Sequence, residues 1–284
     1  MNKLLFSTII VAFNPDERLL KSVKNLMLSE YVKDIFVVDN STSTNEFIEA
    51  INHFPKVTVI SNNGNKGIAY AQDVGIKESQ KKGYNWALTL DHDTILEPSL
   101  LNKYFDFIKS NNYYNIGIVA TDYIDIGIHA PAFNCSEPLE VAETISSGSL
   151  LNIDIYNRIG GFKINYFIDQ VDNEYCYRLQ KNGYKIIVLP GIGMEHRLGK
   201  MQRSSLLGHP MILYNQSPLR TYYRTRNIIW FLREYHDMSL WKSKITDLLK
   251  DPVRFLFEDK TLSKFYFYVK GLLHGIVINY EKTF

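Results

Sequence analysis

The stretch WALTLDHD at residues 86–93 decides the fold of this chain of 284 residues, because an apolar run ends there in two aspartates. Residues 86–90 are too apolar to lie exposed and predict a buried strand. Alternate residues of a strand share a face, so Asp91 and Asp93 are expected to point the same way from its carboxyl end. Two carboxylates so placed suit a Mg²⁺ or Mn²⁺ ion that also binds a substrate diphosphate.

Short apolar runs alternate with helical patterns around this strand, which indicates βα units on a mainly parallel sheet. Strands are expected at residues 4–13, 35–38, 57–60, 86–90, 116–120 and 185–189, and helices at 68–81, 98–110 and 171–182. Asn14 is expected to cap a helix that begins at Pro15. Residues 121–144 show no clear period, and the chain is expected to turn at Pro190.

The sequence therefore predicts an α/β fold, with a Rossmann-like, mainly parallel central sheet flanked by helices. Aromatic and basic helical patterns near the end of the chain predict a C-terminal helical extension at residues 216–284. The catalytic domain is expected at residues 1–215, in two halves at 1–120 and 121–215.

Composition excludes several classes of protein. Apolar residues make up 45% and charged residues 22%, a globular balance. The net charge of +2 argues against nucleic acid as a partner. Cys135 and Cys176 match no metal or redox spacing, which favours a reduced, cytoplasmic protein. The apolar start lacks a small-x-small cleavage site and is interpreted as a strand, and no run is long enough to cross a bilayer.

Polar residues follow each of the first four predicted strands. Asn14 follows the first, Asp39 the second, residues 62–67 the third, and Asp91 and Asp93 the fourth. Ligands of an open parallel sheet bind at the carboxyl ends of its strands, so one crevice is expected to collect all of these residues. A metal ion held there would neutralise the charge of a departing nucleotide diphosphate.

Eight motifs resemble, in order and spacing, the family 2 glycosyltransferases of the GT-A fold, and most closely their rhamnosyltransferase-type branch. They are VAFNPD at 11–16, VVDN at 37–40, NKGIA at 65–69, LDHD at 90–93, SG at 147–148, GGF at 160–162, FIDQVD at 167–172 and RTYYRTRN at 220–227. The chain departs from the family at Asp73, where asparagine is frequent, and at His92, where glutamine is common in this branch.

The resemblance implies roles for individual residues. Asp39 would contact the base or ribose of the nucleotide-sugar donor, Asp91 and Asp93 would serve the metal and the diphosphate, and Asp172 would be the catalytic base. The full set implied for the donor nucleotide, in the first half of the domain, is Ala12, Phe13, Asn14, Asp39, Asn65, Gly67, Asp91 and His92. The second half would receive the acceptor.

Asp172 also has an interpretation from its own neighbourhood. Asp169, Asp172 and Glu174 cluster near the first turn of a helix, where acids are ordinary. The flank at residues 166–168 is aromatic and apolar, which predicts a pocket that raises the pKa of the Asp172 carboxyl. In the expected mechanism Asp172 takes the proton of an acceptor hydroxyl during one in-line displacement, and the anomeric centre is inverted.

Several further residues keep two interpretations. A lone histidine such as His196 is more often structural, whereas the resemblance implies a third metal ligand. Arg197 is either a solvated charge or part of a loop that closes over the diphosphate. Gly148, Asp169, Arg220, Tyr223 and Arg226 are assigned to the acceptor or diphosphate side, although the last three lie at helical spacing and would also suit packing.

The resemblance suggests dTDP-rhamnose as donor and leaves UDP-hexoses open. The acceptor would be a hydroxyl of a glycan or lipid-linked saccharide in cell-surface polysaccharide synthesis. The aromatic and basic residues of the last forty positions predict either contact with the inner face of the membrane, or a homodimer, or packing on the catalytic domain.

Three other functions would account for parts of this sequence. DHDT at residues 91–94 satisfies the nucleophile motif of haloacid-dehalogenase-like phosphatases, with Asp91 as nucleophile, although that motif normally follows a first strand. A nucleotidyltransferase would need a glycine-rich, basic loop after the first strand, where residues 14–16 are NPD. An inactive sugar-binding module would be expected to lack Asp91, Asp93 or Asp172, and all three are present.

Overall fold

The computed structural model describes residues 6–97, 99–110, 114–125, 129–196, 201–206 and 209–278. The chain packs into two compact units. Unit 1 contains residues 1–124, 131–164 and 172–196, and unit 2 contains residues 125–130, 165–171 and 197–284. The predicted domain boundary between 215 and 216 stays a prediction, although the packing groups 197–215 with the C-terminal helices.

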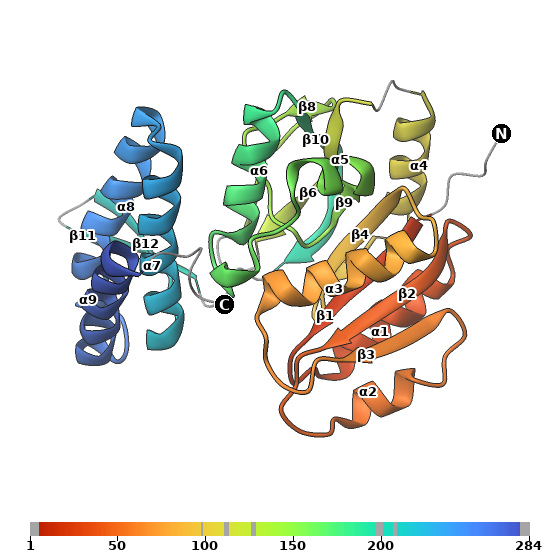
Figure 1. Ribbon diagram of the computed structural model, residues 1–284, viewed down its shortest axis with the longest axis horizontal. Helices are drawn as coiled ribbons and strands as arrows, with labels where there is room; N and C mark the ends of the chain where they lie inside the picture. The colour runs from red at the N-terminus through yellow and green to blue at the C-terminus, as the bar shows by residue number, and fades with distance from the viewer. Residues whose placement is uncertain are drawn as a thin grey trace. The chain divides into compact units, whose positions relative to one another are not determined.

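The large sheet has the strand order β3-β2-β1-β4-β9-β6-β10-β5, with β7 paired to β6 and β8 to β10 (Figure 1). Its strands are β1 (Phe6–Ala12), β2 (Val32–Asp39), β3 (Val57–Ser61), β4 (Trp86–Asp91), β5 (Ile95–Leu96), β6 (Ile116–Asp125), β7 (Ala130–Pro131), β8 (Leu139–Glu140), β9 (Ser149–Asn152) and β10 (Lys185–His196). β1 pairs in parallel with both β2 and β4, whereas β9 runs antiparallel to β4 and β6. The predicted α/β fold with a large central sheet flanked by helices is confirmed. The sheet predicted to be mainly parallel is mixed: it is parallel from β3 to β4, whereas β9 is antiparallel to both of its neighbours and β10 is antiparallel to β5 and β8.

Helices flank this sheet because each presents an apolar face to it. They are α1 (Glu17–Met27), α2 (Glu46–Ile51), α3 (Ile68–Lys81), α4 (Leu100–Ser110), α5 (Ile153–Ile159) and α6 (Val171–Lys181). α3 crosses in front of the parallel strands in Figure 1. It comes so close to β1 that a Cβ at Gly75 would overlap the Ile9 side chain.

The predicted start of the first helix is wrong by two residues. Asp16, not Asn14, is the N-cap of α1: its backbone is extended, with φ −109°, and its carboxylate accepts the Arg18 N–H at 3.0 Å. Asn14 has a left-handed φ of 45°, and its N–H is bound by the Ser41 hydroxyl at 2.9 Å. The Asn14 N–H is thus bound by a side chain from the loop after β2, and Asn14 does not cap the helix.

Two strands run further than the sequence predicts. β6 continues to Asp125, and β10 continues through Pro190 to His196 instead of turning. A proline removes one ladder donor, but β10 pairs with β8 before Pro190 and with β5 after it. Partners far away in sequence thus hold both sides of the proline in the sheet.

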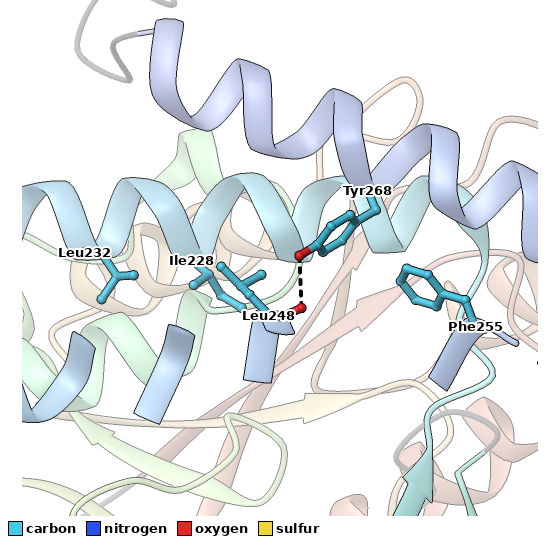
Figure 2. Close-up of a cluster of buried hydrophobic side chains, with 5 residues drawn as sticks. All are labelled: Ile228, Leu232, Leu248, Phe255 and Tyr268. Carbon is cyan, nitrogen blue, oxygen red and sulfur yellow. Dashed lines mark hydrogen bonds between the residues drawn. The ribbon is translucent and has the colours of Figure 1, made fainter. Parts of the chain in front are cut away.

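Unit 2 confirms the predicted helical extension. It contains α7 (Pro218–Tyr235), α8 (Met238–Phe255) and α9 (Thr261–Val277), together with a hairpin of β11 (Gln202–Leu206) and β12 (His209–Leu213). Figure 2 shows the core between the helices, in which the Tyr268 hydroxyl donates to the Leu248 carbonyl at 2.9 Å. The buried members of this core are Ile228, Leu232, Leu248, Phe255 and Tyr268.

α9 packs closely on α7 through two glycines. A Cβ at Gly271 would lie 2.8 Å from the Tyr222 carbonyl oxygen, and one at Gly275 would lie 3.1 Å from the Arg226 carbonyl oxygen. Only glycine permits this backbone approach. Within the described part of the chain, none of the helices combines the length and the apolar character that crossing a membrane requires.

Candidate active site

Asn40 joins the carboxyl ends of β1, β2 and β3 through its backbone N–H and its side-chain amide, and only 2% of this residue is exposed. Its N–H donates to the Ala12 carbonyl at 2.7 Å, which continues the β1–β2 pairing. Its amide nitrogen donates to the Gly67 carbonyl at 3.1 Å, and its amide oxygen accepts from Asn62 at 2.7 Å. One buried amide therefore brings the strand ends and the start of α3 to the same edge.

Hydrogen bonds also fix Asp39, the predicted contact of the donor nucleotide. Asp39 Oδ1 accepts the Ser41 N–H at 2.9 Å, and the Ser41 hydroxyl in turn accepts the Asn14 N–H at 2.9 Å. On the α3 side, Asn65 Oδ1 accepts the Gly67 N–H at 2.9 Å. The structure thus brings Asn14, Asp39, Asn65 and Gly67 to one edge of the sheet, as the strand-end argument predicts.

β4 ends at Asp91, and the turn that follows carries His92 and Asp93. Ser147 anchors the start of this turn. The Asp91 N–H donates to the Ser147 hydroxyl at 3.0 Å, and that hydroxyl lies 2.8 Å from the Thr94 hydroxyl. The Thr94 N–H closes the turn on the Asp91 carbonyl at 3.1 Å. Because Ser147 and Thr94 are buried, the turn rests on the core while the side chains of Asp91, His92 and Asp93 keep partial exposure.

Gly148 follows Ser147 and has a structural reason to be glycine. Its φ is +76°, and a Cβ there would lie 2.7 Å from Met194 Sδ. Its N–H donates to the Thr89 carbonyl at 2.9 Å, and its carbonyl accepts from the Tyr104 hydroxyl. Gly148 is therefore packed against Met194 and bonded to β4 two residues before Asp91.

Arg18, which the sequence patterns do not single out, lies beside the second aspartate. Its Nη1 is 3.6 Å from Asp93 Oδ2, and its guanidinium also bonds Asp16 at 2.8 to 3.1 Å. The hydrogen bonds from Arg18 hold the pKa of Asp16 below its usual range, with a smaller contribution from the charge of His92. His92 therefore lies near the start of α1.

The oxygen donors after β4 fit a divalent cation. Mg²⁺ is commonly held by one or two carboxylates and completes its shell with substrate phosphates and water. Among the described residues no group of three His, Cys, Asp or Glu side chains forms a metal site by itself. An ion held by the Asp91 and Asp93 carboxylates would complete its shell with diphosphate oxygens and water.

Asp172 lies in the first turn of α6, and its Oδ1 accepts the Asn173 N–H at 3.0 Å. This end of α6 is fixed to the segment that leads into Ser147. Asn173 Nδ2 donates to Glu143 Oε2 at 2.6 Å, and the Cys176 thiol lies 3.7 Å from the Thr144 carbonyl. Burial raises the pKa of the Cys176 thiol, so this cysteine stays protonated and structural.

Glu174, the next acid of this cluster, is a structural residue. It is fully buried and forms hydrogen bonds of 2.8 and 2.9 Å with Arg178, one turn further along α6. Asp73 is also structural, because it accepts the Tyr156 hydroxyl at 3.0 Å and pairs with Lys77 at 2.7 Å. The departure from the family at Asp73 therefore has a packing partner.

The predicted residues of unit 2 form a cluster of their own. Arg220 makes a two-pronged ion pair with Asp169 at 2.9 to 3.0 Å. The Tyr223 ring stacks on Phe167, with centroids 4.6 Å apart, and the Arg226 guanidinium lies 4.8 Å from the Tyr223 centroid. The aromatic flank predicted to form a pocket for Asp172 thus packs on α7.

Two predictions reach beyond what the structure describes. Arg197 lies outside the described residues. His196 ends β10, but its side chain also lies outside them, so its role as a metal ligand stays a prediction.

Sequence reasoning missed several residues that build the site. Asn40 and Ser147 lie inside motifs that carry the resemblance, so their position was a usable signal. Arg18 is one of several charges in a surface helix, and only the structure reveals that it meets Asp93.

Acids, amides and a glycine turn at the carboxyl ends of parallel strands are typical of sites that bind phosphorylated nucleotides. Residues 7–147 match the family model described as glycosyl transferase family 2. This match, over almost half of the chain, confirms the resemblance that the motifs predict, and the phosphatase alternative is not supported.

A curated relative is the dTDP-rhamnosyl transferase RfbF of Shigella flexneri, which is 29% identical over 253 residues, or 83% of this chain and 82% of the relative. Among solved structures, S. aureus TarS residues 1–349 with UDP-GlcNAc is similar over 96% of this chain and 80% of that chain, at 17% identity and a TM-score of 0.63. This chain spans 44% of a longer TarS chain. GalNAc-T7 with UDP, GalNAc and Mn²⁺ is similar over 99% of this chain and 57% of that chain, at 14% identity and a TM-score of 0.60. These solved structures share the GT-A fold.

Replacing Ser147 by alanine tests the support of the Asp91 turn. Ser147→Ala leaves the partly buried Asp91 N–H without its acceptor, which costs about 1–3 kcal/mol. We expect the melting temperature to fall by about 2–6 °C and kcat/KM for sugar transfer to fall about tenfold.

The matched control is Ser7→Ala, which removes a weaker hydrogen bond of 3.4 Å to the Trp86 carbonyl at the opposite end of β4. It should leave kcat/KM unchanged. Equal losses of kcat/KM in both variants would contradict the assigned role of Ser147.

Proposed function

We propose that this protein is an inverting, metal-dependent glycosyltransferase that moves L-rhamnose from dTDP-rhamnose onto a hydroxyl of a glycan or lipid-linked saccharide. The convergence of Asp39, Gly67, Asp91 and Asp93 at one strand edge carries the proposal. The likeness to RfbF supports the dTDP-rhamnose donor. A UDP-hexose is the alternative donor, and it is favoured by the fold shared with a UDP-GlcNAc complex.

In the proposed donor site the nucleotide lies along the ends of β1, β2 and β3. Asp39 would accept hydrogen bonds from the base or ribose, in the orientation that Ser41 imposes on its carboxylate. Phe13 is 42% exposed and would cover the base, whereas the buried Ala12 shapes the floor. Asn14, Asn65, Gly67 and His92 complete the lining.

Asp91 and Asp93 would hold Mg²⁺ or Mn²⁺ with the diphosphate, and His196 is proposed as a further ligand. When bound, this ion stabilises the negative charge that collects on the departing nucleotide diphosphate. Arg18 contributes a second positive charge beside Asp93. Arg197 is proposed on the same side.

Asp172 is the proposed base. As the acceptor oxygen attacks the anomeric carbon, its proton moves to the Asp172 carboxylate. The bond from the anomeric carbon to the diphosphate oxygen breaks on the opposite face, and its electron pair leaves with the diphosphate. A single displacement of this kind inverts the anomeric centre without a covalent sugar–enzyme intermediate.

The acceptor side is proposed to include Gly148 and the cluster of Asp169, Arg220 and Tyr223. The Arg220 side chain is 39% exposed, so it keeps surface for a ligand while it pairs with Asp169. Arg226 is 8% exposed and bonds carbonyl groups of its own unit, so we assign it to support of this cluster and not to ligand contact.

A donor panel tests the proposed function. The protein is incubated with dTDP-rhamnose, UDP-glucose, UDP-galactose or UDP-GlcNAc and a cell-envelope glycolipid acceptor, and release of nucleotide diphosphate is measured. We expect release with dTDP-rhamnose and Mg²⁺ or Mn²⁺, and its loss in EDTA. Absence of binding and turnover with every donor and metal would refute the proposal.

Replacing Asp172 tests its proposed role as the base. Asp172→Asn removes the proton acceptor but keeps the shape of the side chain, so kcat for transfer should fall by about 10²–10⁴. Donor affinity, measured by calorimetry, should stay within about twofold of the wild type. Transfer at the wild-type rate would remove Asp172 from the mechanism.

We further propose that the C-terminal helices contact an anionic membrane surface, where a lipid-linked acceptor would be met. α9 exposes an apolar stripe at helical spacing: Leu262, Tyr266, Val269, Leu273 and Ile276 are each at least 50% exposed. Such a stripe beside cationic residues is typical of helices that lie in a membrane interface. We propose that the protein lies in the cytoplasm, at the inner face of the membrane.

The charges of α8 and α9 favour lipid over a second copy of the chain. The acids Asp251 and Glu258 face inward, where Asp251 pairs with Arg254 at 2.8 Å and Glu258 with Lys264 at 2.6 Å. By contrast Lys242, Lys250 and Lys260 are exposed, and they outnumber the acids at the surface of this segment, Asp247 and Asp259. The outer surface is therefore mainly cationic, which complements anionic headgroups and would repel an identical surface.

Vesicle sedimentation tests this contact. The protein should sediment with vesicles of phosphatidylcholine and phosphatidylglycerol, less so with phosphatidylcholine alone, and Leu262→Ser/Leu273→Ser should reduce sedimentation. Leu28→Ser, a control at an 87% exposed leucine of unit 1, should have no effect. A dimer that the double substitution dissociates, without vesicle binding, would contradict the lipid proposal.

A further inference from the structure

Three residues shortly before Asp172 adopt a backbone conformation that residues other than glycine seldom take. The φ angles are +65° at Phe167, +64° at Asp169 and +62° at Gln170. We name residues 165–170 the strained loop. Such conformations are unfavourable and persist only where their surroundings impose them.

The side chain of Asn227 in α7 imposes this conformation. Asn227 is fully buried, and its Nδ2 lies 2.8 Å from the carbonyl oxygens of Tyr166 and Ile168 and 2.9 Å from that of Asp169. The two N–H donors of one amide group are therefore shared among three carbonyls that the left-handed residues turn towards α7.

The neighbouring Arg226 determines which way this amide faces. Asn227 Oδ1 accepts from Arg226 Nε at 3.0 Å and from Nη2 at 2.8 Å. A guanidinium can only donate, so the amide oxygen must face Arg226 and the NH₂ group must face the strained loop. Arg226 Nη2 also reaches the Asn165 carbonyl at 2.9 Å. The two side chains thus act together.

α7 is itself firmly held within unit 2. α9 packs on it through Gly271 and Gly275, and Trp230 Nε1 donates to the Ile278 carbonyl at 2.9 Å. The ion pair of Arg220 with Asp169 adds an outer contact to the loop. The loop is therefore anchored on a rigid helix and not on mobile chain.

We propose that Asn227 is a positioning residue for sugar transfer: by fixing the strained loop, it sets where α6 begins and hence where Asp172 stands. Gln170 is followed directly by Val171, the first residue of α6, and then by Asp172. A shift of the loop is passed to Asp172 through two peptide bonds. The inference rests on the proposed role of Asp172 as base.

Small displacements are costly at such a position. A misplacement of about 1 Å in a reacting group lowers rate by about 100-fold. The proposed donor site is formed by the ends of β1 to β4, whereas the hydrogen bonds of Asn227 are made with Arg226 and the strained loop. Loss of Asn227 should therefore lower kcat and leave donor affinity unchanged.

The test variant is Asn227→Asp in the full chain. It keeps the volume and the contact with Arg226 but replaces the donors by a carboxylate oxygen that the loop carbonyls repel. We expect kcat to fall by between about 10- and 100-fold, with the donor dissociation constant within about twofold of the wild type. In Asn227→Ser the side chain is too short to reach the three carbonyls, so kcat should fall and the donor dissociation constant should stay unchanged in the same way.

A double variant separates positioning from a general loss of structure. Asp172→Glu already displaces the carboxylate, so adding Asn227→Asp should cost less than about threefold in kcat if Asn227 acts through Asp172. The same fold loss in both backgrounds would overturn the proposal. Tyr268→Phe, which removes one hydrogen bond in the core of the same unit (Figure 2), should lower the melting temperature without changing kcat.

The outcomes distinguish this inference from the proposed function. If Asp172→Asn is inactive while Asn227→Asp keeps kcat within about threefold of the wild type, only the positioning role is refuted. If Asp172→Asn is fully active, the proposed base itself is refuted. Failure of both Asn227 variants to fold, where Tyr268→Phe folds, would show that Asn227 serves folding and would also overturn the inference.

Discussion

The buried amide of Asn40 is the interaction on which the rest of the candidate site depends. A parallel sheet brings the carboxyl ends of its strands to one edge, but it does not fix the loops that follow them. Asn40 bonds the end of β1, the Asn62 side chain and Gly67, the N-cap residue of α3. Asp39 and Gly67 are thereby held together, and Ser147 holds Asp91 in the adjacent turn.

The helical unit has a comparable role for the loop before Asp172. Glycines in α9 let α7 be packed tightly, and α7 presents Asn227 and Arg226 to a loop that could not keep its conformation alone. Burial of these two polar side chains is tolerated because each is bonded to carbonyl groups or to the other. We therefore propose two roles for the C-terminal extension: it supports the loop before Asp172, and it provides the surface that contacts a membrane.

The sequence predicted those parts of the site whose signal is local. An apolar run that ends in Asp91 and Asp93 indicates a strand and its ligand end, and the same reasoning places Asp39 and Gly67. The N-cap at Asp16 was missed because a hydroxyl from Ser41, far along the chain, takes the Asn14 N–H. Arg18 and Asn227 were not identified as site residues because helical periodicity does not reveal which distant carboxylate or carbonyl a polar side chain will meet.

Calorimetric titration of dTDP, with and without Mn²⁺, into the wild type and into Asp91→Asn/Asp93→Asn tests the central claim most directly. The central claim is that the carboxyl end of β4 binds a diphosphate through a divalent ion. Wild-type protein should bind dTDP tightly only with Mn²⁺, the double variant should lose this dependence, and Asp106→Asn, an exposed acid of α4, should match the wild type. Equal binding of dTDP by the wild type and the double variant, with or without Mn²⁺, would contradict the account.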